Sequence, residues 1–415
     1  MSHLFEAAWS SMNKMPTRDP KSFGLLWALA KARGLKRLIP TSLKRLGRRL
    51  LPLEDYDPAK WLAEDPYADA EEVSTYPAKV DLRLGIVKEF TRIHSYYIGA
   101  CRELGVPYRL VDISGPDWIS RIERSGCNAF LVRPSGQITV WKQMYDERLR
   151  ILVQDLGKVL FPTYDEVWFY ESKRRMHYWL AANQVPHPHT WVFYDRRQAL
   201  AFAQEVSLPI VFKADFGSGS MGVRIIRDRA ALRRLINRCF KRGFRKTGAD
   251  PRDRQWGSVL FQEYLSDVTE WRMTRVGESY FGYEKVQKGD FHSGSHVFRY
   301  GRPPTDLLRL TKAVTDKGGF LSMALDCFIT SEGRCLVNEM QTTFGLHVSE
   351  GLPMVDGKRG RLVYDPAVDD WRFEEGDFCR NKLCNLRVQT LVTLLMQDRG
   401  VSPSCEGTSP AFAGR

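Results

Sequence analysis

The sequence predicts an α/β (α+β) protein with a helical N-terminal extension, and three observations support this fold class. Strands and helices alternate between residues 81 and 160. A strand, a glycine-rich loop and a second strand follow one another at residues 208–226. Two further strands, joined by a short turn at residues 321–340, carry acidic side chains within apolar sequence. The alternation is typical of a parallel α/β unit, and the other two patterns are typical of hairpins.

Composition limits the class of protein. The chain has 415 residues, a length typical of two or three domains. Hydrophobic residues make up 43% and aromatic residues 12%, which excludes a disordered or fibrous chain. The eight cysteines are scattered without a CxxC pair, so we expect reduced thiols and a cytoplasmic location. No apolar run reaches the roughly 20 residues of a spanning helix, and no signal peptide is recognisable.

Charge is uneven along the chain, although the formal net charge is +13. Residues 1–50 contain eleven Lys or Arg and two Asp or Glu, whereas residues 51–75 contain one Lys and eight Asp or Glu. Apolar residues recur at helical spacing in residues 24–50, which predicts either a basic helix lying on an anionic membrane or two short helices docked on the main body. We favour the docked helices, because a basic helical face is usually only solvated.

The alternating region predicts a small parallel sheet. Its strands and intervening helices are expected at residues 84–87, 97–104, 108–113, 118–124 and 129–132. The third strand ends in Arg133-Pro134-Ser135-Gly136, and loops at the carboxyl ends of parallel strands are where ligands usually bind.

The glycine-rich loop follows a strand that ends in Lys213. A helix at 172–182, a strand at 191–194 and a helix at 197–206 are expected before it. Residues 217–222, Gly-Ser-Gly-Ser-Met-Gly, match GxGxxG, but a strand follows instead of a helix and no acidic residue lies 20 positions on. The pattern is therefore neither a Rossmann nor a Walker A loop. It predicts a hairpin tip whose amides approach a phosphate above Lys213, rather than an ordinary glycine turn.

Three oxygen-bearing side chains lie on the strand pair near residue 330. Asp326 is flanked by apolar residues, and Glu339 and Gln341 share a face by the period-2 rule. Carboxylates within apolar strands are costly unless they are paired or bind a metal. The set therefore predicts a Mg²⁺ site (or Mn²⁺) that bridges nucleotide phosphates.

Together these motifs resemble the ATP-grasp superfamily, of the type that includes glutathione synthetase, D-alanine–D-alanine ligase and ribosomal-protein glutamate ligases. The resemblance covers roughly residues 81–351. It implies an ATP-grasp fold preceded by an α/β substrate domain, and ATP and Mg²⁺ as cofactors. The nucleotide-binding residues that it implies are Lys173, Lys213, Gly217, Ser218, Gly219, Ser220, Met221, Gly222, Gln262, Glu263, Tyr264, Leu265 and, on the ribose, Asp267 or Glu270.

The resemblance also implies catalytic and metal-binding residues. Arg272, with Lys285, would stabilise charge at the transferred phosphoryl group, and Asp326, Glu339 and Gln341 match the metal ligands. The family usually has Asn where this chain has Gln341, which puts a second metal site in doubt. The predicted domains are an N-terminal extension (1–79), a preceding α/β domain (80–164), an ATP-grasp domain (165–351, with the nucleotide cleft between 165–259 and 260–351), a C-terminal extension (352–400) and a disordered tail (401–415).

Three functions are compatible with these motifs. The first is an enzyme, a ligase that activates a carboxylate as an acylphosphate and joins it to an amine or a thiol. The second is a phosphotransferase that acts on a hydroxyl of an anionic substrate, and the third is a non-catalytic protein that binds nucleotides or polyanions. Residues 224–254 contain twelve Lys or Arg and three Asp or Glu, so they either dock an anionic small-molecule or peptide substrate or form a solvated helix face. No specific nucleic acid is expected, and a homo-oligomer is compatible with the sequence.

Overall fold

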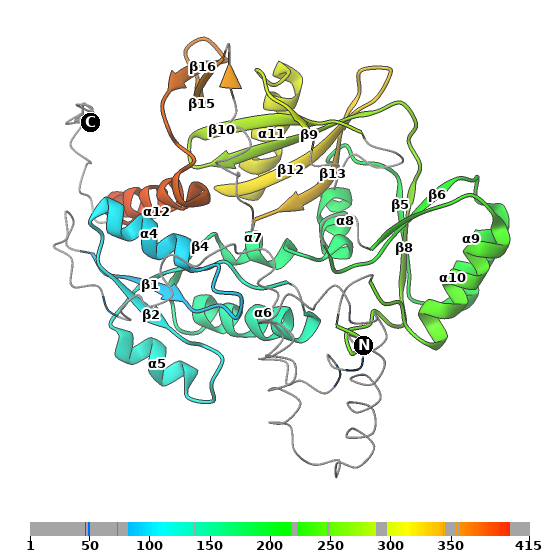
Figure 1. The fold of residues 1–415 in the computed structure, drawn as a ribbon, viewed down its shortest axis with the longest axis horizontal. Coiled ribbons are helices and arrows are strands. Elements are labelled where there is room, and N and C mark those ends of the chain that lie inside the picture. Colours follow the sequence, from blue (N-terminus) through cyan, green and yellow to red (C-terminus); the bar gives the residue numbers. More distant parts are fainter. Residues whose placement is uncertain are drawn as a thin grey trace, which may run out of the picture.

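The computed structural model describes residues 46, 49, 73, 82–136, 138–217, 222–246, 250–287, 297–342, 344, 354–355 and 357–398. Figure 1 shows three sheets with helices packed against them. The predicted N-terminal extension and tail lie outside the described residues, apart from Leu46, Arg49 and Val73. Within the described ranges, no helix is both long and apolar enough to cross a membrane.

The first sheet is parallel and has the strand order β2-β1-β3-β4. Its elements are β1 (Leu84–Val87), α4 (Ser95–Leu104), β2 (Tyr108–Val111), α5 (Trp118–Ser125), β3 (Ala129–Leu131), α6 (Thr139–Gln154), β4 (Val159–Phe161) and α7 (Tyr164–Phe169). β1 is central, and all four of its residues are buried. Gly85 is required there, because a Cβ atom would lie 2.2 Å from the Phe130 ring. One face packs against α4 and the other against α5 and α6.

The second sheet is antiparallel and carries the glycine-rich loop. Its elements are β5 (Thr190–Phe193), α9 (Arg196–Glu205), β6 (Ile210–Lys213), β7 (Val223–Ile226), α10 (Arg229–Lys241) and β8 (Val259–Glu263). The strand order is β5-β8-β6-β7, and Lys213 pairs with Val223 across the predicted hairpin. Both helices begin at aspartate caps, Asp195 and Asp228, whose carboxylates accept backbone N–H groups. A separate core around Phe212 and Phe261 holds this unit together.

The third sheet is the largest, with the main order β13-β12-β9-β10-β15-β14. It comprises β9 (Thr269–Val276), β10 (Ser279–Lys285), β11 (Phe298–Arg299), β12 (Ser322–Ile329), β13 (Cys335–Gln341), β14 (Met354–Val355), β15 (Lys358–Asp365) and β16 (Asp370–Glu375), with α8 (Lys173–Ala182) and α11 (Thr305–Gly318) packed against it. The strands that were predicted to carry Asp326 and Glu339 are β12 and β13, which pair antiparallel. The predicted α/β fold class is confirmed.

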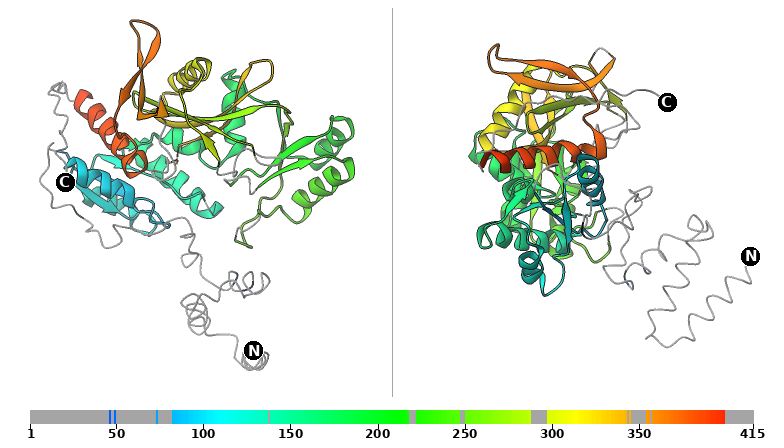
Figure 2. Two further views of the ribbon diagram at one scale, coloured as in Figure 1. Left: turned by 45° about the horizontal axis from the view of Figure 1, so that its top comes forward. Right: turned by 90° about the vertical axis from the view of Figure 1, so that its left-hand side faces the viewer.

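The chain after residue 357 connects two of these units. β15 and β16 extend the large sheet, and a short helical turn, η3 (Arg380–Leu383), leads into α12 (Cys384–Asp398). α12 leaves the large sheet and lies along α4 (Figure 2), where Val388 and Leu391 enter the core of the first sheet. The C-terminal helix therefore holds the first domain against the large sheet.

Candidate functional site

A pocket lies between the second sheet, which carries the glycine-rich loop, and the third and largest sheet. It encloses about 320 Å³ of empty space that is open to solvent. Its lining residues come from α8, β6, β8, β13 and the segment before and including the start of β5: Lys173, Met176, His177, Leu180, His187, Thr190, Lys213, Leu260, Gln262, Val337 and Asn338. Apolar side chains from three elements and two lysines thus share one cavity, which suits a flat apolar ring attached to anionic groups.

The two predicted phosphate-binding lysines meet at neighbouring residues of β13. Lys213 Nζ donates to Asn338 Oδ1 over 2.6 Å. Lys173 Nζ lies 3.4 Å from Glu339 Oε1 and donates to the carbonyl oxygen of Gly217 over 2.6 Å. Residues that are far apart in the sequence are therefore brought together at one end of the pocket.

Asp215, which the sequence analysis did not single out, fixes the spacing of these lysines. Its side chain is completely buried and accepts hydrogen bonds from Ser172 Oγ (3.1 Å) and from the backbone N–H of Arg174 (2.8 Å). Its carbonyl oxygen accepts the N–H of Lys173. Asp215 follows Lys213 by two residues, and its side chain and its carbonyl oxygen both bind the start of α8. It therefore ties the first turn of α8 to the end of β6.

The two lysines differ in how firmly they hold a proton. Burial lowers the pKa of Lys213 to about 8, although Glu339 opposes that shift. Burial also disfavours the charge of Lys173, but the carboxylates of Glu339 and Glu171 outweigh it, so the pKa of Lys173 is raised. The charged form is therefore favoured at Lys173 and disfavoured at Lys213.

Asp326 is held in a buried ion cluster. Arg272 donates to both of its carboxylate oxygens through Nε and Nη2, each over 2.7 Å. Lys285 Nζ lies 2.6 Å from Asp326 Oδ2 and 2.6 Å from Glu270 Oε1. Burial alone would raise the pKa of Asp326, but Arg272 and Lys285 together hold it well below the usual range. The cluster places both predicted catalytic cations beside a predicted metal ligand.

The three predicted metal ligands lie on paired strands. Asp326 is opposite Glu339, and Gln341 Nε2 donates to Glu339 Oε1 over 3.0 Å. Burial favours the neutral form of Glu339, but Lys173, Lys213 and the Gln341 hydrogen bond together outweigh it and lower the pKa, so the carboxylate is ionised. Two carboxylates and an amide oxygen are a donor set that Mg²⁺ accepts when phosphate oxygens and waters complete its shell. Among the described residues, no group of three or more His, Cys, Asp or Glu gathers as a self-sufficient metal site.

The two ends of the glycine-rich loop are anchored differently. At the first end, Gly217 has φ +130° and its N–H donates to Glu171 Oε2 over 2.6 Å. At the second end, the carbonyl oxygen of Gly222 accepts the N–H of Ala214 over 2.9 Å, and a Cβ atom would lie 2.7 Å from the Ala214 side chain. The remaining loop residues of the prediction, Ser218, Gly219, Ser220 and Met221, lie outside the described residues.

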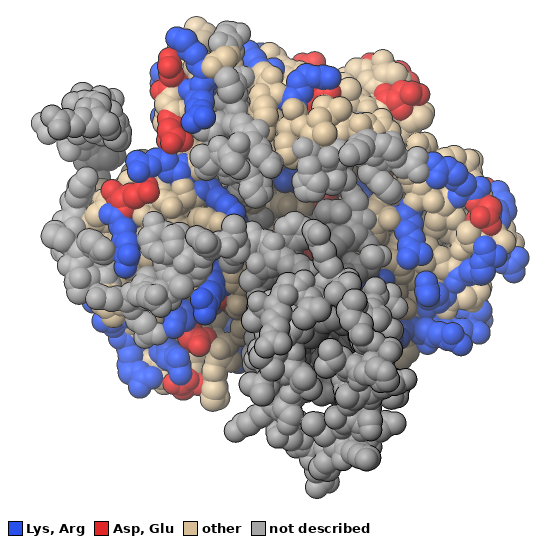
Figure 3. All heavy atoms as spheres, viewed as in Figure 1, with Lys and Arg blue, Asp and Glu red and all other residues tan. Residues whose placement is uncertain are grey.

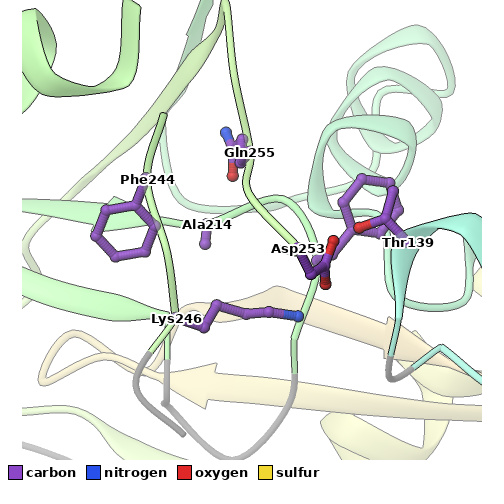
Figure 4. Close-up of a pocket in the computed structure, with 7 residues that line it drawn as sticks. Thr139, Ala214, Phe244, Lys246, Asp253 and Gln255 are labelled. Carbon is purple, nitrogen blue, oxygen red and sulfur yellow. The ribbon is translucent and has the colours of Figure 1, made fainter. Parts of the chain in front are cut away.

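Lys246 is a third lysine beside this loop, and the sequence analysis did not identify it as a site residue. It lines a second cavity of about 220 Å³, together with Thr139, Ala214, Phe216, Phe244, Asp253 and Gln255. Figure 4 shows its side chain extending below the β6 end toward Asp253 and Thr139. A Cβ atom on Gly217 would lie 2.6 Å from Lys246 Cδ, so a side chain at position 217 would displace this lysine from its present place.

Burial lowers the pKa of Lys246, while Glu171 and Asp253 oppose the shift. The ammonium therefore remains within electrostatic reach of the Glu171 carboxylate that holds Gly217. Asp253 Oδ2 is buried and has no hydrogen-bond partner in the described part of the chain. Lys246 is thus placed to neutralise additional phosphate charge at the base of the loop.

Lys246→Met is expected to weaken ATP binding roughly 3- to 10-fold, because a partly exposed ammonium contributes about 1 kcal/mol to binding a phosphate. Adenosine binding should not change, since it lacks phosphates. Calorimetric titration of both ligands measures the difference. Lys241→Met, at the exposed end of α10, is the matched control. An equal loss for ATP and adenosine would contradict a role at the phosphates.

The predicted base and ribose contacts fall into two groups. Gln262 lines the pocket and donates to Thr190 Oγ1 over 3.3 Å, while Glu263 accepts the N–H of His189 over 2.7 Å. The next residues, Tyr264 and Leu265, follow β8 and are half-buried. Of the two predicted ribose ligands, Asp267 is exposed with φ +55°, whereas Glu270 is buried against Lys285. In this arrangement Asp267 is the carboxylate accessible to a ribose.

His177 is a further pocket residue that the sequence analysis missed. Its Nδ1 atom is buried and has no hydrogen-bond partner among the described residues, and its ring lies 5.4 Å from that of His187. Burial lowers the pKa of His177 to about 4, so the imidazole is neutral at physiological pH. A neutral, unpartnered ring nitrogen on a residue that lines the pocket is available to a base edge. Its only signal in the sequence is its place one helical turn after Lys173.

Basic residues gather on the outer surface of α10. Figure 3 shows Lys and Arg side chains concentrated over the side of the molecule that Figure 1 labels α9 and α10. The exposed residues of this group are Arg224, Arg227, Arg229, Arg233, Arg234, Arg238, Lys241 and Arg242. The opposite face of α10 buries Leu232, Leu235 and Ile236, as the solvated-helix interpretation requires. Docking of an anionic substrate on the outer face remains a prediction.

Comparison with known proteins finds a family match for one segment of the chain. Residues 173–250 match the family model of the ATP-binding domain of the carbamoyl-phosphate synthase L chain. The match begins at Lys173 and includes Lys213 and the glycine-rich loop, and it confirms the predicted resemblance to ATP-grasp proteins. No curated protein matches the chain significantly.

Several solved structures have a similar fold. A RimK domain ATP-grasp protein from Sphaerobacter thermophilus DSM 20745 is 16% identical; the match covers 63% of this chain and 91% of that chain, with a TM-score of 0.47. For D-alanine–D-alanine ligase from Bacillus anthracis complexed with ATP, the identity is 13%, the coverage 76% and 99%, and the TM-score 0.48. N5-carboxyaminoimidazole ribonucleotide synthetase from Thermotoga maritima is 14% identical; the match covers 63% of this chain and 68% of that chain, with a TM-score of 0.44.

Proposed function

We propose that this chain is an ATP- and Mg²⁺-dependent ligase that activates a carboxylate as an acylphosphate and joins it to an amine or a thiol. The main support for this proposal is the position of two lysines. Two buried lysines from α8 and β6 converge on β13 beside Glu339, which lies opposite Asp326 on the neighbouring strand. The family match over residues 173–250 supports ATP as the nucleotide.

The proposed reaction has two steps. A carboxylate oxygen of the donor attacks the γ-phosphorus of ATP, the bond to the β,γ-bridging oxygen breaks, and ADP leaves. The amine nitrogen or the thiol sulfur of the acceptor then attacks the carbonyl carbon of the acylphosphate, loses a proton and expels phosphate. Both steps depend more on positioning and charge neutralisation than on covalent help from the protein.

The residues of the chain supply these two requirements. Lys173 and Lys213 neutralise the phosphates, and the N–H of Gly217 is a donor that can exchange Glu171 for a phosphate oxygen. Arg272 and Lys285, held in place by Asp326 and Glu270, supply positive charge where the phosphoryl group is transferred. The positions of these groups are set before the nucleotide arrives, because most of them are buried and hydrogen-bonded.

Asp326, Glu339 and Gln341 are the residues that would hold Mg²⁺. When bound, Mg²⁺ neutralises the charge of the phosphate oxygens. The ionised state of both carboxylates suits this role, because a cation binds the deprotonated form.

Titration of the full chain with ATP, with and without Mg²⁺, tests the proposal first. ATP at about 100 times its dissociation constant should stabilise the protein by about 2.7 kcal/mol, which a thermal-shift measurement detects. Screening pairs of carboxylates with amines or thiols then separates the functions. A ligase releases ADP and phosphate with an amide or a thioester, whereas a phosphotransferase yields ADP and a phosphorylated product without free phosphate. Failure to bind ATP would contradict both.

The pH dependence of ATP binding is a further prediction. Because the pKa of Lys213 is about 8 in the ligand-free protein and the phosphates stabilise its ammonium form, the pKa rises on binding. ATP affinity should therefore be highest below pH 8 and fall by up to tenfold per pH unit above it. Calorimetry between pH 6.5 and about 9.5 measures this decline. Lys213→Arg, whose guanidinium stays charged, should abolish the decline, and a decline that persists would assign it to another group.

A further inference from the structure

Arg133 is a buried cation with an unused donor. It follows β3 at the carboxyl end of the first sheet, and only 4% of its surface is exposed. Nη2 donates to the carbonyl oxygen of Phe344 over 3.2 Å, and Nη1 lies 4.0 Å from Cys384 Sγ. Nε is buried and has no hydrogen-bond partner in the described part of the chain. A buried guanidinium nitrogen without a partner is costly, which indicates that a ligand completes its surroundings.

Lys382 brings a second cation to the same place. Its Nζ lies 4.5 Å from the ring centre of Tyr96, and the guanidinium carbon of Arg133 lies 5.8 Å from that centre. The backbone of Asn381, Lys382 and Leu383 is left-handed, with φ of 46°, 52° and 68°. Three successive non-glycine residues rarely adopt this conformation, and here it directs Lys382 over Tyr96.

No carboxylate in the described ranges lies within ion-pair distance of either cation. The neighbouring Arg380, by contrast, pairs with Glu103 over 3.3 Å. Arg387 adds a third positive charge, since its Nη2 donates to the same carbonyl oxygen of Phe344 over 3.0 Å. Arg387 is fully satisfied, because its other nitrogens donate to Ser322 Oγ and to the carbonyl oxygen of Lys382. Glu166 interacts electrostatically with Arg387, but no ion pair of the described residues balances Arg133 or Lys382, and an anion would balance them.

This cluster lies close to the phosphate site. The loop from Arg133 to Gly136 spans three residue steps, so its ends are at most about 11 Å apart. Gly136 touches Glu171: a Cβ atom there would lie 2.2 Å from Glu171 Cγ. On the other side, Phe344 follows Gln341 by three steps, again at most about 11 Å. Short chain segments therefore connect the cluster to the phosphate site on both sides.

We propose that Arg133 and Lys382, over the ring of Tyr96, bind the unreacted anionic group of the small substrate whose other end is activated or attacked at the phosphate site. The position of the reacting end rests on the proposed ligase function, whereas the anion site itself does not. The anchored group is a carboxylate or a phosphate, because a guanidinium Nε–H and an ammonium both donate to such oxygens. The substrate is thus bifunctional, with a carboxylate or an amine at one end and an anion at the other.

Calorimetric titration of the full chain with inorganic phosphate and with glutarate, at constant ionic strength, tests this site. We expect saturable binding of at least one probe, weakened at least tenfold by Lys382→Met and by Arg133→Gln. Lys382→Met removes a half-buried charge and no hydrogen bond in the described structure, so it reports on binding even if Arg133→Gln impairs folding. Arg380→Met, on the same helical turn but paired with Glu103, is the matched control and should not change the affinity.

The choice of probe identifies the anion: phosphate alone indicates a phosphorylated substrate, and glutarate indicates a dicarboxylate or an acidic amino acid. Phosphate binding that Lys213→Met removes and Lys382→Met leaves intact would place the ion at the nucleotide site and overturn the proposal. So would the absence of saturable binding. ATP titrated on the same samples separates the two proposals: Lys382-dependent anion binding without ATP binding supports the anion site and contradicts the ligase.

Discussion

Lys213→Met is expected to weaken ATP binding by roughly 10- to 150-fold and to remove most turnover. The reason is that hydrogen bonds to a charged group contribute about 1.5 to 3 kcal/mol, and each 1.4 kcal/mol is a factor of ten in affinity. Lys213 is 8% exposed and its ammonium lies at the polar end of the pocket, beside Asn338. Calorimetric titration with ATP in the presence of Mg²⁺ measures the affinity.

The stability of the ligand-free protein should change little in the same variant. Burial disfavours the ammonium of Lys213, so the substitution removes a destabilising charge. It also leaves Asn338 Oδ1 without its donor, and these two effects oppose each other. Lys241→Met, on the surface of α10, controls for loss of a positive charge. If Lys213→Met lowered the unfolding temperature but left the affinity for ATP intact, Lys213 would be a structural residue instead.

Asp326→Asn is expected to lower the free energy of unfolding by about 3 kcal/mol or more and to remove activity. The substitution leaves the buried Arg272 without its balancing carboxylate and leaves Lys285 paired with Glu270 alone, and breaking such a buried pair typically costs about 3 to 5 kcal/mol. Urea denaturation measures this loss. The matched control is Asp369→Asn, which disturbs an exposed pair with Arg309 and should have a much smaller effect, because water and salt screen exposed ion pairs.

The Asp326 cluster also predicts a pH dependence of stability. Because the folded pKa of Asp326 lies below the ordinary value near 3.9, its stabilisation is fully present above that value and is lost as the pH falls below it. Asp326→Asn should therefore lower stability at neutral pH and flatten the acid limb of the stability curve. An unchanged acid limb would show that other carboxylates govern acid unfolding.

The short buried strands could be predicted because each is an apolar run bounded by turn residues. β1 and β3 are buried along their full length, so a continuous apolar run marks them in the sequence. β9 was not predicted as a strand, since charged residues interrupt its apolar pattern. Glu270 and Arg272 are tolerated there only because Lys285 and Asp326 pair with them from the neighbouring strands. Such pairing is a tertiary property that no local pattern contains.

The residues of the candidate site also divide into those that a local pattern predicts and those that depend on tertiary structure. Lys213 could be predicted because it ends a strand before a glycine-rich loop, and Glu339 because it interrupts an apolar strand. Lys246 could not be predicted, since its place depends on a turn closed by the bridge between Phe244 and Gln255 and on the space above Gly217. Arg133 could be noted only as part of a loop, because the second cation of the proposed anion site is Lys382, which lies some 250 residues later in the chain.

The C-terminal helix has a mechanical consequence. α12 closes the first domain onto the large sheet, so these two units behave as one frame with shared cores. The unit built on the second sheet has its own core, and it contacts the frame through the segments before β5 and after β8 and through the hydrogen bonds of Asp215 and Lys213. Because hydrogen bonds rather than a shared core link it to the frame, we expect this unit to move relative to the frame more easily than the two parts of the frame move relative to each other. Lys213 would move with this unit, whereas Asp326, Glu339 and Arg133 belong to the frame, so such a movement would open the proposed nucleotide site without disturbing a substrate anchored at Tyr96.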